Sequence, residues 1–388
     1  MLDAAVELDA WRLGVVLAAL GRDRGPGAMR AAEWTMEWGK RKPGLLNVVH
    51  YTSLLTQLGR RGRWKDAEAA FDEMKAAAML PTVVAYNTLV SAYEKGGGQW
   101  ERAEEAVAEM RAAGLRPDIY TYSALVSAYE KGGGQWERAE AAFKEMKAAR
   151  VQCDAVVYNS LISTLAKGGQ WVRARDLLAE MKEAGVQPDV ITYNALITAF
   201  EKGAQWERAE AAFEEMKAAR LLPDQTTFNA LISAYEKGGG QWEKAEAAME
   251  EMRAARVRPD RITFNALISA YEKGGGQWAK AEAAMKEMKE AGVQPDVITF
   301  NALISSYEKG GGQWERAEAV MYKMRMAGLQ PTERTYNALI STYAKGGGQW
   351  ERAEAAVKAM RKAGVPATAI TYNALITACE HGGQVSPV

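Results

Sequence analysis

The chain has 388 residues, which exceeds what one hydrophobic core usually covers but sets no limit on an array that buries surface only between neighbouring units. Lys+Arg and Asp+Glu both total 49, so no overall charge attracts a polyanion or an anionic membrane, and affinity for nucleic acid would have to come from charge distribution. No run approaches the roughly 18 apolar residues of a membrane span, and Cys153 and Cys379 lie far apart without a CxxC pair. We therefore expect no membrane contact, disulfide scaffold, metal ion or other cofactor.

The first 47 residues differ from the rest of the chain. They contain the segments WRLGVVLAAL and GAMRAAEWTMEW, which predict two helices in a degenerate N-terminal capping hairpin over residues 1–47. Asp3, Glu7 and Asp9 lie in the first apolar stretch, whereas transit peptides are rich in Arg and Ser and poor in acidic residues. No transit peptide is visible in this chain.

Residues 48–368 consist of nine similar units. The segment VITYNALITAFEKGAQWERAEAAFEEMKAARLLPD, residues 190–224, recurs with small variations, and an aromatic residue opens every unit. These aromatics are spaced by 35 or 36 residues and comprise Tyr51, Tyr86, Tyr122, Tyr158, Tyr193, Phe228, Phe264, Phe300, Tyr336 and, in the incomplete last unit, Tyr372. Self-similarity at this period is typical of a solenoid.

Each unit predicts two helices. A Pro-Asp pair such as Pro188-Asp189 ends the preceding helix and supplies an N-cap oxygen to the first helix, in which Ile191, Leu196 and Phe200 have helical spacing. A glycine cluster, Gly96-Gly97-Gly98 in the second unit, supplies positive φ angles and turns the chain back.

The second helix of the unit at residues 190–224 runs over residues 206–219, with Ala209, Ala212, Phe213 and Met216 on one apolar stripe. Its end favours a left-handed residue, and Gly fills that place in several units. Arg150, Arg220 and Arg256 replace Gly in three units, and we expect those ends to fray more easily. Together these patterns predict an all-α fold, an α-solenoid of stacked helix-turn-helix repeats.

Residues 369–388 predict an incomplete final repeat and a tail. A first helix covers residues 370–380, and the chain then ends at residues 381–388, where a second helix would begin. Either a lone helix closes the stack or the sequence is truncated.

The period, the opening of the 190–224 segment, its second helix and the closing Pro-Asp together resemble the pentatricopeptide repeat family over about residues 48–380. The tetratricopeptide repeat, the nearest alternative, has a period of about 34 residues and a W-x2-L-G-x2-Y opening that is not found here. The resemblance implies a P-class-like array without a C-terminal editing or nuclease domain. It also implies binding of single-stranded RNA at about one base per repeat.

In this family the residue after the opening aromatic reads a base together with the residue that closes the repeat. Carried over to this sequence, the base-reading pairs are Asn87 and Asp118, Ser123 and Asp154, Asn159 and Asp189, Asn194 and Asp224, Asn229 and Asp260, Asn265 and Asp296, Asn301 and Thr332, and Asn337 and Thr368. Asn carries a donor and an acceptor, which suits the mixed edge of a pyrimidine.

By the same resemblance, Asn with Asp favours uracil and Ser123 with Asp154 favours guanine. The units that close with Thr332 and Thr368, and the first unit with Thr52 and Thr82, have less defined specificity. The expected site is U-G-U-U-U-U from 5′ to 3′, followed by loosely specified pyrimidines.

Two further rows fit the resemblance. The apolar residues one turn before the readers are expected to sandwich the bases and comprise Val84, Tyr120, Val156, Ile191, Ile262 and Ile298. Thr226 and Arg334 interrupt this row. The lysines at the end of the first helices are expected to contact phosphates and comprise Lys95, Lys131, Lys167, Lys202, Lys237, Lys273, Lys309 and Lys345.

Structural roles compete with each of these interpretations. The helix dipole alone favours a Lys in the last turn, the Asn can bond local backbone, and the Asp can simply cap a helix. The tryptophans that open the second helices, such as Trp64 and Trp100, are expected to be packing residues and not a ladder for bases.

The sequence predicts no enzyme, because His50 and His381 are the only histidines and no zinc-deaminase or phosphate-loop motif is present. We expect a monomer in a chloroplast or mitochondrion that binds U-rich single-stranded RNA and acts in RNA stability, processing, splicing or translation, with other RNA-processing proteins as further candidate partners. The alternative is a helical-repeat scaffold that binds a protein or peptide.

Overall fold

The computed structural model describes residues 10–22, 26–42 and 44–383. The remaining residues of the expected cap and tail, 1–9, 23–25, 43 and 384–388, lie outside this description. Within the described ranges, the regular structure consists of twenty-one α-helices and no strand. The predicted all-α helical-repeat fold is therefore confirmed. None of these helices is both long and apolar enough to span a membrane.

The chain divides into two compact units, residues 1–195 and 196–388, which are described separately. The helices of the first unit are α1 (Ala10–Arg22), α2 (Pro26–Lys40), α3 (Val48–Arg60), α4 (Trp64–Ala76), α5 (Val83–Lys95), α6 (Trp100–Ala112), α7 (Ile119–Lys131), α8 (Trp136–Ala148), α9 (Ala155–Lys167) and α10 (Trp171–Glu183). Helix α11 (Val190–Lys202) contains the boundary between the units.

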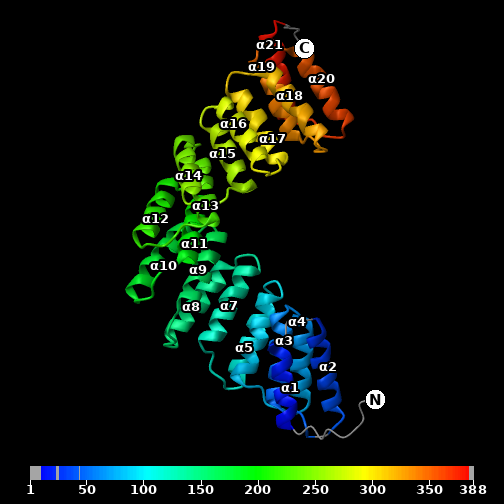
Figure 1. Ribbon diagram of the computed structural model, residues 1–388, viewed down its shortest axis with the longest axis vertical. Coiled ribbons are helices and arrows are strands. Elements are labelled where there is room, and N and C mark those ends of the chain that lie inside the picture. The colour runs from blue at the N-terminus through cyan, green and yellow to red at the C-terminus, as the bar shows by residue number, and fades with distance from the viewer. Residues whose placement is uncertain (1–9, 23–25, 43, 384–388) are drawn as a thin grey trace. The chain divides into compact units, whose positions relative to one another are not determined.

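The helices of the second unit are α12 (Trp206–Ala218), α13 (Gln225–Lys237), α14 (Trp242–Ala254), α15 (Arg261–Lys273), α16 (Trp278–Glu290), α17 (Val297–Lys309), α18 (Trp314–Met326), α19 (Glu333–Lys345), α20 (Trp350–Lys362) and α21 (Ala369–His381). In both compact units each complete repeat is a first helix followed by an antiparallel second helix (Figure 1).

Inside each unit the first helices form one layer and the second helices form another. In the first unit α3 packs on α5, α5 on α7 and α7 on α9, while α4 contacts both α3 and α5. The second unit repeats this pattern from α13 to α21. The predicted stripe of Ala209, Ala212, Phe213 and Met216 is buried, as expected for a helix that packs against two neighbours.

The backbone φ angles in the turns agree with most of the predictions from the sequence. Gly97 and Gly98 adopt positive φ angles of 99° and 70°, but Gly96 ends its helix at φ −79°, so the prediction of positive φ is wrong for the first glycine of the cluster. Gly is required there for space instead, because a Cβ atom on Gly96 would lie 2.2 Å from Cδ1 of Trp64. Arg150 is left-handed at φ 57°, where Gly185 has φ 75°, as the end of the second helix requires.

The second helices are joined to the next repeat by an aromatic and ionic cluster. At one such junction the Trp100 and Tyr129 rings lie 6.3 Å apart, and the Arg138 guanidinium is 4.5 Å from the centroid of the Trp100 ring. Glu104 accepts a 2.6 Å hydrogen bond from the Tyr129 hydroxyl and pairs with Arg138 at 2.7 Å. Burial and the nearby Glu104 raise the pKa of Tyr129. The tryptophans thus pack between repeats, as predicted.

Helices α1 and α2 pack on each other, and α1 packs on α3. Two buried side chains of α3 fix this contact: Gln57 donates a 3.0 Å hydrogen bond to the Leu17 carbonyl, and His50 Nε2 lies 2.8 Å from the Ala10 carbonyl oxygen. The capping role of this hairpin and the division into nine repeats stay predictions.

Candidate nucleic-acid interface

Each predicted reader is the fifth residue of a first helix, and each closing residue is the N-cap of the next first helix. Side-by-side packing of these helices brings the two residues together although about 30 residues separate them in sequence. Hydrogen bonds from the Asn amide nitrogen to the Asp carboxylate join Asn87 to Asp118 (2.9 Å), Asn159 to Asp189 (3.1 Å), Asn229 to Asp260 (3.2 Å) and Asn265 to Asp296 (3.1 Å). Asn194 and Asp224 belong to different compact units of the chain, so their pairing stays a prediction.

A threonine that sequence reasoning missed completes each of these pairs. It is the third residue of the next first helix, and its hydroxyl donates to the carbonyl oxygen of the reader Asn. The bonds run from Thr121 to Asn87, from Thr192 to Asn159 (2.5 Å), from Thr263 to Asn229 (2.5 Å) and from Thr299 to Asn265 (2.6 Å). All four threonines are 0% exposed.

These contacts fix the orientation of the Asn amide. The carboxylate of Asp118 can only accept hydrogen bonds, so the amide NH2 of Asn87 must face it. The Thr121 hydroxyl accepts a hydrogen bond from the Asp118 backbone N–H at 3.1 Å, and Asn87 Oδ1 is the nearer of its two possible acceptors. Each Asn keeps one amide proton and one carbonyl lone pair for a ligand, in a fixed order.

The Asp296 carboxylate is held in its ionised form. Partial burial of Asp296 acts to raise its pKa, but hydrogen bonds from the Thr299 backbone, the Asn265 amide and the Thr299 hydroxyl outweigh burial, and Arg261 adds to them. The pKa of Asp296 is consequently lower than its ordinary value. The acceptor that positions Asn265 therefore stays charged at neutral pH.

The unit of Ser123 lacks this network. Asp154 caps α9 by accepting a 3.0 Å hydrogen bond from the Val157 backbone N–H, but the position of the orienting threonine is occupied by Val157 itself. The first repeat also lacks the network. Thr52 donates to the Val48 carbonyl of its own helix, and Ala85 stands at the position of the orienting threonine.

The units that close with Thr keep the orienting threonine but lose the carboxylate. Asn301 accepts a 2.6 Å hydrogen bond from Thr335 and donates a longer one, 3.4 Å, to the Thr332 hydroxyl. Asn337 accepts a 2.6 Å hydrogen bond from Thr371. Its amide donates to Glu333 at 3.4 Å, and Thr368 also donates to Glu333 at 2.8 Å, so a carboxylate from its own helix takes the place of the missing Asp.

The predicted sandwiching residues form an exposed apolar row one turn before the readers. Their exposed fractions lie between 55% and 72%, and the row comprises Val84, Tyr120, Val156, Ile191, Ile262 and Ile298. Apolar side chains left in solvent at one position of successive repeats are typical of a binding surface. Arg334 interrupts the row and reaches Glu272, two repeats earlier, with an ion pair of 3.3 Å.

Most of the predicted phosphate-contacting lysines are already paired with carboxylates. Six of the eight lie against a Glu of the preceding first helix at 2.5 to 3.2 Å, in the pairs Lys131–Glu94, Lys167–Glu130, Lys237–Glu201, Lys273–Glu236, Lys309–Glu272 and Lys345–Glu308. Lys95 and Lys202 differ, because Gly59 and Ala166 occupy the place of the Glu in the preceding first helices, and neither lysine has an ion pair with any described residue. The glutamates were missed because their partners are one repeat away.

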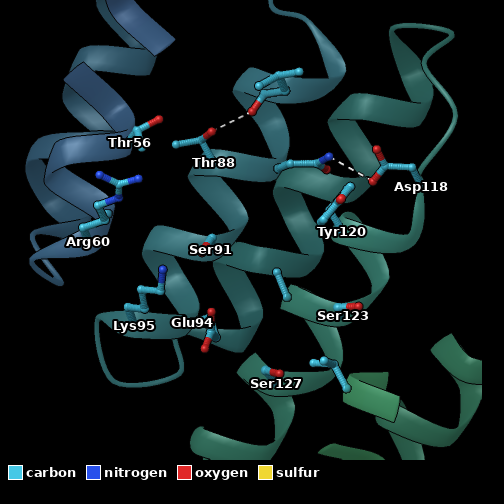
Figure 2. Close-up of a pocket in the computed structure, with 15 residues that line it drawn as sticks. Thr56, Arg60, Thr88, Ser91, Glu94, Lys95, Asp118, Tyr120, Ser123 and Ser127 are labelled. Atoms are coloured by element: carbon cyan, nitrogen blue, oxygen red, sulfur yellow. Dashed lines mark hydrogen bonds between the residues drawn. The ribbon is translucent and has the colours of Figure 1, made fainter. Parts of the chain in front are cut away.

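The rows meet in a groove of about 560 Å³ between α3, α5, α7 and α9. Figure 2 shows Asp118, Tyr120 and Ser123 on one side of this groove and Arg60 and Lys95 on the other. The groove therefore presents polar readers, an apolar wedge and basic side chains together. In the part of the chain that the structure describes, no group of three His, Cys, Asp or Glu residues could hold a metal ion.

Fold and site together define a protein of tandem helical hairpins in which successive repeats present the same polar and apolar positions. The sequence pattern of the PPR repeat family matches residues 46–95, 81–131, 154–202, 188–237, 223–273 and 335–381, which together make up more than half of the chain. The pattern of the pentatricopeptide repeat domain matches residues 283–346, and that of the PPR repeat matches residues 120–151 and 262–293. The chain belongs to the PPR repeat family.

Two pentatricopeptide repeat-containing proteins of Arabidopsis thaliana are similar to parts of this chain. One is 39% identical over 69 residues, which is 18% of this chain and 8% of that protein. The other is 41% identical over 51 residues, 13% of this chain and 5% of that protein. The chain thus matches only a small part of each of these relatives.

The crystal structure of the pentatricopeptide repeat protein PPR10 from maize is similar over 97% of this chain and 58% of the maize chain, with 28% identity and a TM-score of 0.56. The maize protein has also been solved in complex with an 18-nt psaJ RNA element, and that structure covers 97% of this chain and 57% of its own, with 29% identity and a TM-score of 0.44.

Proposed function

We propose that this chain binds single-stranded RNA in a sequence-selective manner, at about one base per repeat and with a preference for uracil. The observation that carries the proposal is the row of Asn amides held in one orientation, most of them beside an exposed apolar wedge. A relative of the same family, the maize protein, binds an RNA element. RNA-binding helical repeats read unstacked bases through polar side chains and hold them by stacking.

A fixed amide orientation supports discrimination between the two pyrimidines. Uracil offers an N3–H donor beside the O4 acceptor, whereas cytosine offers an N3 acceptor beside the N4 donor. An Asn held as donor and acceptor in a fixed order matches one of these edges and would have to flip to match the other. In the Asp-closed units a flipped Asn229 would turn its carbonyl toward the Asp260 carboxylate, which is unfavourable.

The closing threonines relax this choice. A hydroxyl such as that of Thr332 can donate or accept, so it tolerates either orientation of Asn301. The unit of Asn301 would then prefer uracil over cytosine less strongly than the Asp-closed units. Ser123, with no threonine to hold it and a shorter side chain, would read guanine only weakly.

The lysines at the ends of the first helices, together with their Glu partners, determine how strongly phosphates bind. Lys95 and Lys202, which have no Glu at the pairing position, are the strongest candidates for phosphate contacts, while the six paired lysines must exchange a Glu for a phosphate. We therefore propose a moderate dependence of affinity on salt, with a contribution from each repeat smaller than that of an unpaired lysine.

In this account the protein acts by occupying its RNA, as a monomer in a chloroplast or mitochondrion, and thereby affects the stability, processing, splicing or translation of the transcript. Catalysis is no part of the proposal.

Fluorescence anisotropy with labelled oligo-U, oligo-C and oligo-A tests the proposal. We expect oligo-U to bind more tightly than oligo-A, and the affinity to fall as the salt concentration rises. Equal binding of all three oligonucleotides, or none, would contradict RNA reading and favour a scaffold that binds a protein or peptide.

A further inference from the structure

The threonine at the third position of the first helices accompanies only one kind of reader. In sequence, every Asn reader with a following repeat is followed by such a threonine, in the order Thr121, Thr192, Thr227, Thr263, Thr299, Thr335 and Thr371. The two other readers, Thr52 and Ser123, are followed by Ala85 and Val157. Within this one chain the threonine and the reader Asn of the preceding repeat occur together.

Helix formation does not require this threonine. Helix α9 begins with Val157 at the third position, and Asp154 still caps it through a 3.0 Å hydrogen bond from the Val157 backbone N–H. Helix α5 begins with Ala85 there, and Thr82 caps it. Helices α7 and α9 pack side by side, as do α3 and α5, so the stacking of repeats does not need the hydroxyl either.

The threonine bond is also more constant than the bond to the closing residue. The distance from the threonine hydroxyl to the Asn carbonyl stays at 2.6 Å for Asn301 and Asn337, where the closing Asp is absent. By contrast, the Asn301 amide has only a 3.4 Å contact with Thr332, and the Asn337 amide finds Glu333 instead. The threonine is therefore the common element that holds the readers Asn87, Asn159, Asn229, Asn265, Asn301 and Asn337.

We propose that this orienting threonine is a third specificity-determining position, which acts from the next repeat by fixing the amide of the Asn reader and so lets it distinguish uracil from cytosine. The proposal rests on the RNA-binding function proposed above. The threonine is a positioning residue, since Thr335 is completely buried and its hydroxyl forms hydrogen bonds with the reader and with the start of its own helix.

Selection of RNA ligands from a random pool tests this position by position. The site enriched by the wild-type protein sets the register. Thr335→Val keeps the shape of the side chain but removes the hydroxyl, and we expect the ratio of uracil to cytosine to fall roughly fivefold at the single position read by Asn301. Thr263→Val should have a smaller effect, about twofold, because Asp260 still holds Asn229. Thr335→Ser retains the hydroxyl and should restore the wild-type ratio.

The unit of Ser123 allows the reverse experiment. Ser123→Asn alone supplies a reader beside Asp154, and the double variant Ser123→Asn with Val157→Thr adds the orienting hydroxyl. We expect uracil to replace guanine at this position in both variants, with a ratio of uracil to cytosine roughly fivefold higher in the double variant.

The outcomes separate the two proposals. If the wild-type protein enriches U-rich RNA but Thr335→Val leaves the base preference at every position unchanged, the orienting role is wrong while RNA reading stands. If Thr335→Val lowers the melting temperature and weakens binding equally at all positions, the threonine is only structural and the inference is again wrong. If the wild-type protein enriches no RNA, both proposals fail together.

Discussion

The repeats that begin with α7 and with α13 differ in which part of the proposed base-binding site they carry: one has the stacking residue and the other has the oriented reader. Helix α7 carries the exposed aromatic wedge Tyr120, but its reader Ser123 has no network around it. Helix α13 has the polar Thr226 in the wedge position, but Asn229 is held by both Asp260 and Thr263. The contrast indicates that stacking and base reading are separate functions, which the chain can vary independently from repeat to repeat.

The largest effect is expected when the base-reading Asn residues are replaced. Changing Asn229 and Asn265 to Thr, with Asp260 and Asp296 left in place, removes the uracil-matching amides, and preference should move from uracil toward guanine at two adjacent positions. We expect a loss of about 2 to 3 kcal/mol in binding to the U-rich site. Binding to matched RNAs measures this change, and unchanged preference at the position of Asn337 is the internal control. A uniform loss at all positions would argue against base reading.

The next largest effect on RNA affinity is expected from the residues that stack on the bases. Tyr120→Thr should weaken binding by about 1 to 2 kcal/mol without changing the preferred base, because an aromatic wedge stacks on any base. Thr226→Tyr should strengthen binding in the same sense. Tyr322→Thr, which changes an exposed tyrosine of the second helix α18, serves as the control and should have no effect. An altered base preference in either test variant would show that stacking and reading are not separate.

A smaller effect is expected from the ion pairs that both repeats share. Glu236→Gln frees Lys273 in the way that Gly59 frees Lys95, and affinity for RNA should rise about twofold at low salt. The slope of log K against log salt should steepen by up to about 0.7 as one further phosphate is contacted. Glu250→Gln on the second helix α14 is the matched control, since its partner Arg253 lies on the same helix. Weaker binding by Glu236→Gln would mean that the pair supports the fold.

The smallest effect concerns stability alone. Arg220 has a left-handed conformation at φ 59°, which costs a non-glycine residue free energy, so Arg220→Gly should raise the free energy of unfolding by about 1 kcal/mol or less. Gly292→Ala, at φ 74° with open space around it, should lower it by a similar amount. Chemical denaturation measures both, and RNA affinity should stay unchanged. Destabilisation by Arg220→Gly would show that the Arg side chain makes a stabilising contact.

Much of the fold could be predicted because the sequence repeats its own local signals. Capping Asp, turn glycines and the Ala209–Met216 stripe each act within a few residues, and the helix bounds follow from them. The negative φ of Gly96 could not be predicted in this way, because its need for glycine comes from Trp64 in the preceding repeat.

The site was only partly predictable for the same reason. The Asn and Asp pairs came from resemblance to the family, but the amide orientation depends on Thr263 and its equivalents, about 34 residues away from the reader. The same separation hid the pairing of Lys273 with Glu236, and Glu333 was hidden because it replaces a closing Asp from a different helix position. A signal for the threonine was nevertheless present, since it accompanies Asn and is absent beside Thr52 and Ser123.

The base preference of the wild-type protein at each position, measured by selection from a random RNA pool, tests most directly whether the repeats read RNA bases. We expect a run of uracils for the consecutive Asn and Asp units of Asn159, Asn194, Asn229 and Asn265, preceded by a weak guanine for Ser123 and followed by pyrimidines with a weaker preference for uracil at Asn301 and Asn337. An enriched site without a uracil run, or a pool that stays random, would contradict this expectation.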